Sequence, residues 1–128
     1  GISYNYVSQQ GSADLVLGGI TRAEATNNAI PTSVLAWTTR SQPTKMATLY
    51  YGSVEKTLYK IDRAAVYLIE SDEASVTSGA RKLVVHEMGH ALGYLGHYNY
   101  GTVMTEYFGD ITSTTPSAAE KNHLGQVY

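Results

Sequence analysis

The sequence predicts a single α+β domain, because strand-like segments fill its first 70 residues and two helical patterns follow at residues 77–92 and 117–127. The chain has 128 residues, 43% of them hydrophobic and 16% charged, which suits one globular core. No internal repeat and no linker-like change of composition divides it. We therefore expect residues 1–128 to form one domain.

Short runs rich in β-branched and aromatic residues predict the strands. They lie at residues 13–17, 34–39, 46–51, 57–59 and 64–69. Gly18-Gly19 is expected to end the first strand, and Gly52-Ser53 can form a turn. The last two segments can pair as a hairpin. Thr21 and Glu24 have the spacing of a capping box, so at most a short helix follows before residue 31.

The two helices of the second half are predicted by caps and breakers. The polar run at residues 71–79 indicates a loop, after which Thr77 or Ser78 can cap a helix that continues to about residue 92. Gly93 is a natural stop for this helix. Thr115-Pro116 has the form of a helix start, so a last helix is expected at residues 117–127.

Charge and composition exclude several classes of partner and site. The net charge is −2 and no Lys/Arg cluster is present, so we expect neither nucleic-acid binding nor attraction to anionic lipid. No apolar segment approaches the ~20 residues of a membrane span, and no signal-peptide pattern opens the chain. Because the chain has no cysteine, a metal would have to bind to His, Asp or Glu side chains.

Three of the four histidines, His86, His90 and His97, fall within twelve residues. At roughly 100° per residue, His90 lies about 40° from His86 around the predicted helix, so both rings share one face. Side chains four residues apart can reach one zinc ion at its nitrogen distance of ~2.0–2.1 Å. Glu87 points beside this pair and is the candidate general base for a metal-activated water.

A catalytic zinc needs a third protein ligand and an open fourth position. Gly93 can let the chain curl back after the helix, which would bring His97 to the same ion. The spacing of Glu106 and Asp110 offers an alternative, in which a glutamate from a downstream helix is the third ligand. The glycines around this segment argue against a helix there.

These residues give the chain a resemblance to the metzincin zinc peptidases, and to their matrixin group in particular. The resemblance rests on the run from His86 through Glu87, Met88, Gly89 and His90 to Ala91-Leu92-Gly93, then His97, then Val103-Met104. It implies a twisted mixed β-sheet packed on the active-site helix and the C-terminal helix, zinc bound to three histidines, and a methionine turn at Met104. It further implies that residues 34–38 form the edge strand that pairs with substrate.

The resemblance also implies which side chains contact a peptide. These are Leu35, Ala36 and Trp37 on the edge strand, with Tyr107 after the methionine turn as a candidate for the pocket or for oxyanion stabilisation. His97 stands one residue later than the commoner family spacing, and Gly96 can absorb the extra residue. Only a short segment precedes residue 13, so a truncation at the N-terminus is one expectation. His123, far from the motif, is expected to be a partly exposed helix residue.

We therefore expect a zinc-dependent endopeptidase with one catalytic zinc ion, acting as a monomer on a peptide or protein substrate. The alternative is a zinc-stabilised peptide-binding domain without catalysis. A secreted or cell-surface location follows from the resemblance and from the absence of cysteine. Calcium has no support, because the acidic residues do not form the alternating loop of a dedicated site. They are Asp62, Glu70, Asp72, Glu73 and Asp110.

Overall fold

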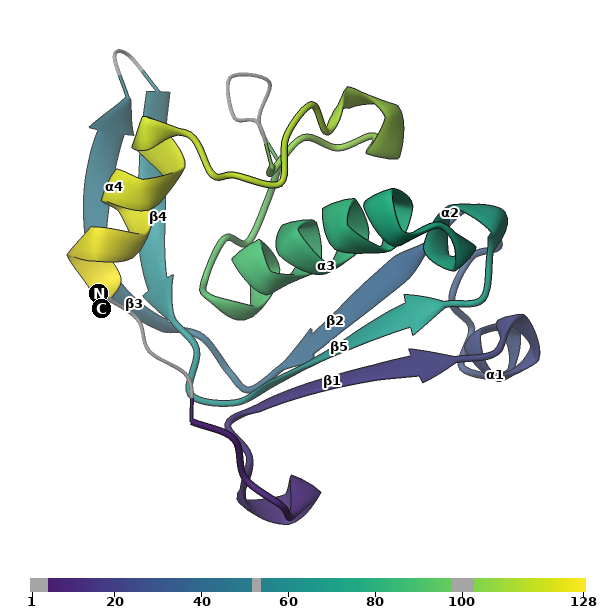
Figure 1. Cartoon of the computed structure of the whole chain (residues 1–128). Helices are drawn as coiled ribbons and strands as arrows, with labels where there is room; N and C mark the ends of the chain where they lie inside the picture. The colour runs from purple at the N-terminus through teal and green to yellow at the C-terminus, as the bar shows by residue number, and fades with distance from the viewer. Residues whose placement is uncertain (1–4, 52–53, 98–102) are drawn as a thin grey trace.

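A three-stranded sheet and a two-stranded sheet form the β part of the structure, a computed structural model that describes residues 5–51, 54–97 and 103–128 (Figure 1). The strands are β1 (Leu15–Ile20), β2 (Ala36–Arg40), β3 (Thr44–Tyr51), β4 (Val54–Lys60) and β5 (Ala64–Ile69). The helices are α1 (Arg22–Asn27), α2 (Asp72–Ser75), α3 (Thr77–Ala91) and α4 (Ala118–Val127), with single 3₁₀ turns at Gln10–Ser12 and Phe108–Asp110. The mixed α+β class is therefore confirmed.

The three-stranded sheet, called the main sheet below, has the order β1-β5-β2. Strand β1 runs parallel to β5, whereas β2 runs antiparallel to it. Strand β5 takes the central place because its apolar residues are buried, with Val66 and Ile69 1% and 0% exposed. Strand β2 consequently forms an edge of the main sheet, as expected for residues 34–39.

Two expectations for the strands are wrong. Residues 57–59 do not pair with β5; they belong to β4, which pairs with β3 in the two-stranded sheet. Strand β1 does not end at Gly18 but continues to Ile20. The Tyr67 ring crosses the sheet over Gly18, where an added Cβ would lie 3.3 Å from the ring, so the glycine makes room for the ring inside a strand. The turn expected at Gly52-Ser53 lies outside the described residues.

The helix starts follow local capping, with one exception. Thr21 and Ser117 each form the capping box with a glutamate three residues later. Helix α4 therefore begins after Ser117, within one residue of the predicted range 117–127, and Thr115-Pro116 lies before its cap. The exception is α3, which begins at Thr77 with Val76 in the cap position and no side-chain cap. Part of the expected loop before it forms the short helix α2.

Each of the two long helices packs on a different sheet. Helix α3 lies across one face of the main sheet, against β2 and β5 (Figure 1). Helix α4 packs beside β3 and β4 and does not cover the main sheet, contrary to the expected packing of both helices on one sheet. A buried cluster of Tyr94, Val103 and Met104, contacted by Val85 of α3 and Leu124 of α4, connects the two halves.

Candidate functional site

Helix α3 carries His86, Glu87 and His90 on the side that faces the main sheet and the chain after the helix. His86 and Glu87 are 7% and 8% exposed, so both polar side chains are buried in the protein. Buried polar groups need hydrogen-bond partners or a bound ion. The partners of these three residues therefore define what the site can do.

Gly93 ends α3 and returns the chain toward the helix. Its φ is +106°, in the left-handed region that glycine adopts without strain. An added Cβ would also collide with the carbonyl oxygen of Tyr59. The Tyr94 amide then donates to the Gly89 carbonyl at 3.0 Å, and the next residues bring His97 over the other two histidines.

The three histidines meet through their Nε2 atoms. The His86–His90, His90–His97 and His86–His97 Nε2 distances are 3.2, 3.3 and 3.2 Å. The Nδ1 atom of His86 lies 2.7 Å from the Val103 carbonyl oxygen, and that of His90 lies 2.7 Å from the Tyr94 carbonyl oxygen. A carbonyl oxygen only accepts, so both Nδ1 atoms carry the proton and both Nε2 atoms present lone pairs.

This arrangement could hold a metal ion. Lone pairs that converge at such distances repel one another unless a cation lies between them, and second hydrogen bonds from Nδ1 to carbonyl groups are typical of histidine ligands. Within the part of the chain that the structure describes, it is the one group of three or more His, Cys, Asp or Glu residues close enough to share an ion. The group contains His97 and not Glu106, the alternative third ligand.

Two of the histidines, His90 and His97, are held neutral by their surroundings. Burial, followed by the neighbouring His86 and His97 rings and the Arg40 guanidinium, lowers the pKa of His90 to about 3. Burial and His86 also lower the pKa of His97, although Glu106 opposes this shift. Protons therefore compete little with a cation for these two rings at neutral pH.

Glu87 lies beside the histidine cluster in a buried environment that raises its pKa, while a hydrogen bond from Thr38 and the charge of His86 lower it. The Thr38 hydroxyl comes from strand β2, on the opposite side of the site. No pattern in the sequence predicts that Thr38 contacts Glu87. It was missed because 49 residues separate the two side chains and no local spacing connects them.

Met104 forms the floor of the site. It is 1% exposed and packs so closely against α3 that a Cβ at Gly89, between the two histidines of the helix, would collide with its sulfur. Met104, which is expected in a methionine turn, therefore lies against the helix that carries His86 and His90. Its neighbour Val103 supplies the carbonyl group that orients His86.

Glu120 of α4 holds this turn in place, and it was also missed by the sequence analysis. Its carboxylate accepts hydrogen bonds from the amides of Val103, Met104 and Ser117 at 3.0, 2.9 and 2.6 Å. Burial raises the pKa of Glu120, but these backbone donors outweigh it, so the pKa lies below its usual value. The capping-box spacing to Ser117 was the one available signal.

His123 lies one helical turn from Glu120 and is buried, not partly exposed as expected. Its side chain is 2% exposed and stacks on the Tyr94 ring at a centroid distance of 3.9 Å. The Tyr94 hydroxyl in turn donates to the Glu120 carbonyl at 2.9 Å. His123 therefore packs beneath the methionine turn and does not join the histidine cluster.

A cleft of about 540 Å³ runs between β2 and the histidine cluster. Leu35, Ala36 and Trp37 line it, as predicted for substrate-contacting residues, and Phe108 and Ile111 form the opposite wall. Tyr107 does not line this cleft and is 66% exposed, because the chain turns at Phe108 and places that ring in the wall instead.

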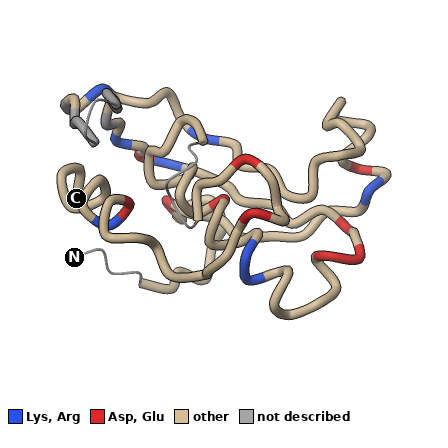
Figure 2. The backbone as a smooth tube through the Cα atoms, turned by 90° about the horizontal axis from the view of Figure 1, so that it is seen from above, with Lys and Arg blue, Asp and Glu red and all other residues tan. Residues whose placement is uncertain are grey.

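Charged residues are few in this cleft. They are Arg40, Glu87 and Glu106. Figure 2 shows the Lys and Arg residues of the described backbone in short, scattered stretches, some of them beside Asp or Glu. The cleft is therefore mainly apolar along its walls, with its polar groups concentrated at the histidines and Glu87.

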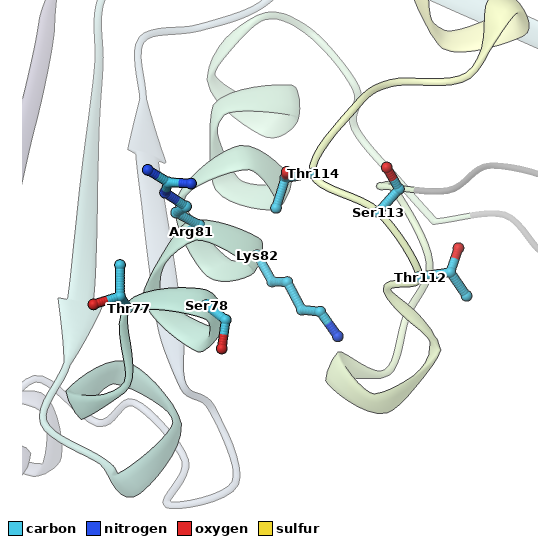
Figure 3. A pocket seen from close by; sticks show the side chains of 7 residues that line it. All are labelled: Thr77, Ser78, Arg81, Lys82, Thr112, Ser113 and Thr114. Carbon is cyan, nitrogen blue, oxygen red and sulfur yellow. The ribbon is translucent and has the colours of Figure 1, made fainter.

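A second hollow, of about 530 Å³, lies between the first turns of α3 and residues 112–114 (Figure 3). Arg81 and Lys82 lie beside it, with hydroxyl side chains from both segments. The Lys82 ammonium lies 5.6 Å from the centroid of the Phe108 ring, and Phe108 lines the cleft, so the hollow and the cleft both border the Phe108 segment. No histidine or carboxylate lines it, and it takes no part in the histidine site.

Comparison with known proteins leaves the geometry as the main guide to function. Among the described residues, no helix has both the length and the apolar character that crossing a lipid bilayer requires. The chain matches no protein-family model, no curated protein and no solved structure with which it was compared.

Proposed function

We propose that this protein is a zinc-dependent endopeptidase in which His86, His90 and His97 bind the ion and Glu87 is the general base. The observation that carries the proposal is the convergence of three Nε2 atoms at 3.2–3.3 Å beside a buried carboxylate. The residue pattern that resembles the metzincins supports it. A secreted or cell-surface location, expected from the same resemblance, is part of the proposal.

The donor set fits zinc. At zinc–nitrogen distances of about 2.0–2.1 Å, the nitrogens of a tetrahedral site lie roughly 3.3–3.4 Å apart, close to the observed separations. Neutral imidazole is a good ligand for zinc, and three protein ligands leave one position for a water or a substrate, as in catalytic sites. When bound, the ion supplies Lewis-acid chemistry, which lowers the pKa of water and polarises a carbonyl group.

The chain itself supplies proton transfer. Glu87 takes a proton from the attacking water, whose oxygen forms the new bond to the peptide carbonyl carbon. Glu87 then gives that proton to the amine nitrogen as the carbon–nitrogen bond breaks. Water is consumed, and its second proton also leaves with the products, a carboxylate and a protonated amine, while no bond forms between the enzyme and the substrate. A raised pKa suits a carboxylate that must both accept and return a proton.

The substrate would bind as an extended peptide along β2. On either side of this strand, the Leu35 carbonyl accepts from the Ile69 amide and the Ser41 amide donates to the Arg63 carbonyl. These bonds, with the antiparallel register, direct the odd-numbered residues toward β5, so the main chains of Ala36, Thr38 and Arg40 face the open edge. A peptide can therefore add to this edge through main-chain hydrogen bonds.

A peptide library tests the proposal with zinc-loaded parent protein beside Glu87→Gln. Removing a general base should lower the rate by roughly 10²–10⁴-fold while the variant keeps one zinc per chain and its fold. Chelation should abolish cleavage by the parent and added zinc should restore it. Cleavage that survives full removal of zinc would overturn the proposal, whereas peptide binding without cleavage by the folded, zinc-loaded parent would support the non-catalytic alternative.

Zinc titration of His97→Ala tests the ligand set, with Glu106→Ala as the matched control. Loss of an imidazole ligand should weaken zinc binding by more than about 100-fold, since even partners outside the ligand shell account for about 10–100-fold. Glu106→Ala should bind zinc as the parent does. The reverse pattern would assign the third ligand to Glu106.

A further inference from the structure

Thr38 lies in the middle of β2 and is placed to contribute to two parts of the proposed mechanism, substrate binding and proton transfer. Its side chain is 9% exposed and lies on the face of β2 toward α3. Its main chain faces the open edge, because the hydrogen-bonded pairs with β5 are formed by the odd-numbered residues on either side. One residue therefore borders both the path of the peptide and the general base.

The Thr38 hydroxyl has two acceptors on Glu87. Its Oγ1 atom lies 2.5 Å from the carboxylate Oε2 atom and 3.1 Å from the Glu87 carbonyl oxygen. A hydroxyl has a single proton to donate, and an ionised acceptor forms the shorter and stronger bond, so the carboxylate is its partner. This bond occupies Oε2 and fixes the plane of the carboxylate, which leaves Oε1 for other partners.

We infer that Thr38 is a positioning residue: its hydroxyl orients the Glu87 carboxylate for proton transfer, while its main chain pairs with the substrate. The inference rests on the proposed function and assigns a role beyond the ligands and the base. It follows that a peptide bound at the correct depth along β2 contacts the same residue that fixes the base. Productive binding and a correctly oriented base are thereby linked through one side chain.

The role predicts a separation of kinetic constants. Without the hydroxyl, the carboxylate can rotate away from its productive orientation, whereas the main chain of β2 still binds peptide. Thr38→Val keeps the shape of the side chain and should lower kcat roughly tenfold with KM unchanged within about twofold, a fraction of the 10²–10⁴-fold that a general base contributes. Thr38→Ser restores the hydroxyl and should restore kcat.

Thr39→Val is the matched control, since Thr39 is the next residue of the same strand, is exposed, and directs its side chain to the opposite face. It should have the kinetic constants of the parent, and all variants should carry one zinc per chain. An unchanged kcat in Thr38→Val, a rise in KM alone, or a Thr38→Ser variant as slow as Thr38→Val would overturn the inference.

A double-mutant cycle separates this inference from the proposed function. Urea unfolding of zinc-loaded Thr38→Val, Glu87→Leu and the double variant reports the hydrogen bond without any need for activity. Non-additive losses support the bond, and additive losses overturn it. If the parent cleaves no peptide, the proposed function and the positioning role fail together. A non-additive cycle would then still show the hydrogen bond, as a structural contact between β2 and α3.

Discussion

Residue 89 has no side chain, and the Met104 sulfur fills the space that this leaves against helix α3. Gly89 lies between His86 and His90 in sequence, so this contact sets the distance between Met104 and the helix that carries the two histidines. Close contact of this kind stabilises a protein only while both partners keep their shape. Gly89 therefore acts through packing, although it lies in the most polar part of the molecule.

Gly89→Ala should consequently destabilise the protein by about 1–3 kcal/mol, the usual cost of forcing an extra methyl group into a packed interior. Thermal unfolding measures the change. Gly125→Ala, the same substitution in α4 with nothing within 4 Å, should leave the melting temperature unchanged or raise it, because alanine favours a helix. Equal melting temperatures for Gly89→Ala and the parent would contradict the packing role of Met104.

Among the residues of the site, those joined by short spacing could be predicted from the sequence, and those joined by tertiary contacts could not. His86, Glu87 and His90 occupy one helix, so the helical period alone relates them. Thr38 and Glu120 reach the site from β2 and α4. No local sequence pattern predicts the contacts that they make there. Tyr107 was predicted from its distance to Met104, but the turn at Phe108 redirects the chain.

At the scale of elements, α4 supports the methionine turn through one carboxylate. Three backbone amides donate to Glu120, and the turn in turn orients His86 through the Val103 carbonyl. The order of these contacts runs from α4 to the turn and then to α3. A substitution in α4 should therefore change the orientation of His86 in the histidine cluster, although no residue of α4 belongs to that cluster.

Glu120→Ala tests this connection. It leaves three amide donors without their carboxylate, so the free energy of unfolding should fall by about 2–3 kcal/mol. Zinc affinity should fall by about tenfold, as for other groups that orient ligands. Glu120→Gln keeps one acceptor oxygen and should lie between Ala and the parent in both measurements. A loss of stability with parental zinc affinity would show that the turn does not orient His86.

The elements themselves were predicted well where local signals dominate. Strand β5 has the predicted bounds, and the predicted capping box at Thr21 locates the start of α1. The last helix was predicted from Thr115-Pro116, and its cap is Ser117. The pairing of the strands could not be predicted from local signals, because it depends on which apolar faces are buried against one another. The sequence contains no signal that divides the five strands into two sheets or that assigns α4 to the smaller one.

For the whole molecule, the neutral state of His90 makes stability depend on pH. In the metal-free protein His90 has a pKa of about 3, whereas in the unfolded chain a histidine has its ordinary value near 6.5. Between these values the unfolded state binds a proton that the folded state does not. Folding is therefore penalised progressively as the pH falls below about 6.5, and the penalty is absent above it.

Urea unfolding of the metal-free protein from pH 8 to pH 5 measures this effect. The free energy of unfolding should be level above about pH 7 and should fall by about 1 kcal/mol for each unit below 6.5 on account of His90. The loss should be smaller in His90→Gln, which has no ring to protonate. Parallel curves for the two proteins would exclude His90 as the source of the acid sensitivity.

The short interval between His86 and His97 has a consequence for how the site assembles. Closing a loop of this length costs the disordered chain little entropy, and the cost rises only with the logarithm of loop length. If the three histidines bind an ion as proposed, the same imidazoles can also reach it in the denatured chain, before β2 or α4 has formed. An ion that binds both the folded and the unfolded state stabilises the fold by less than its affinity suggests.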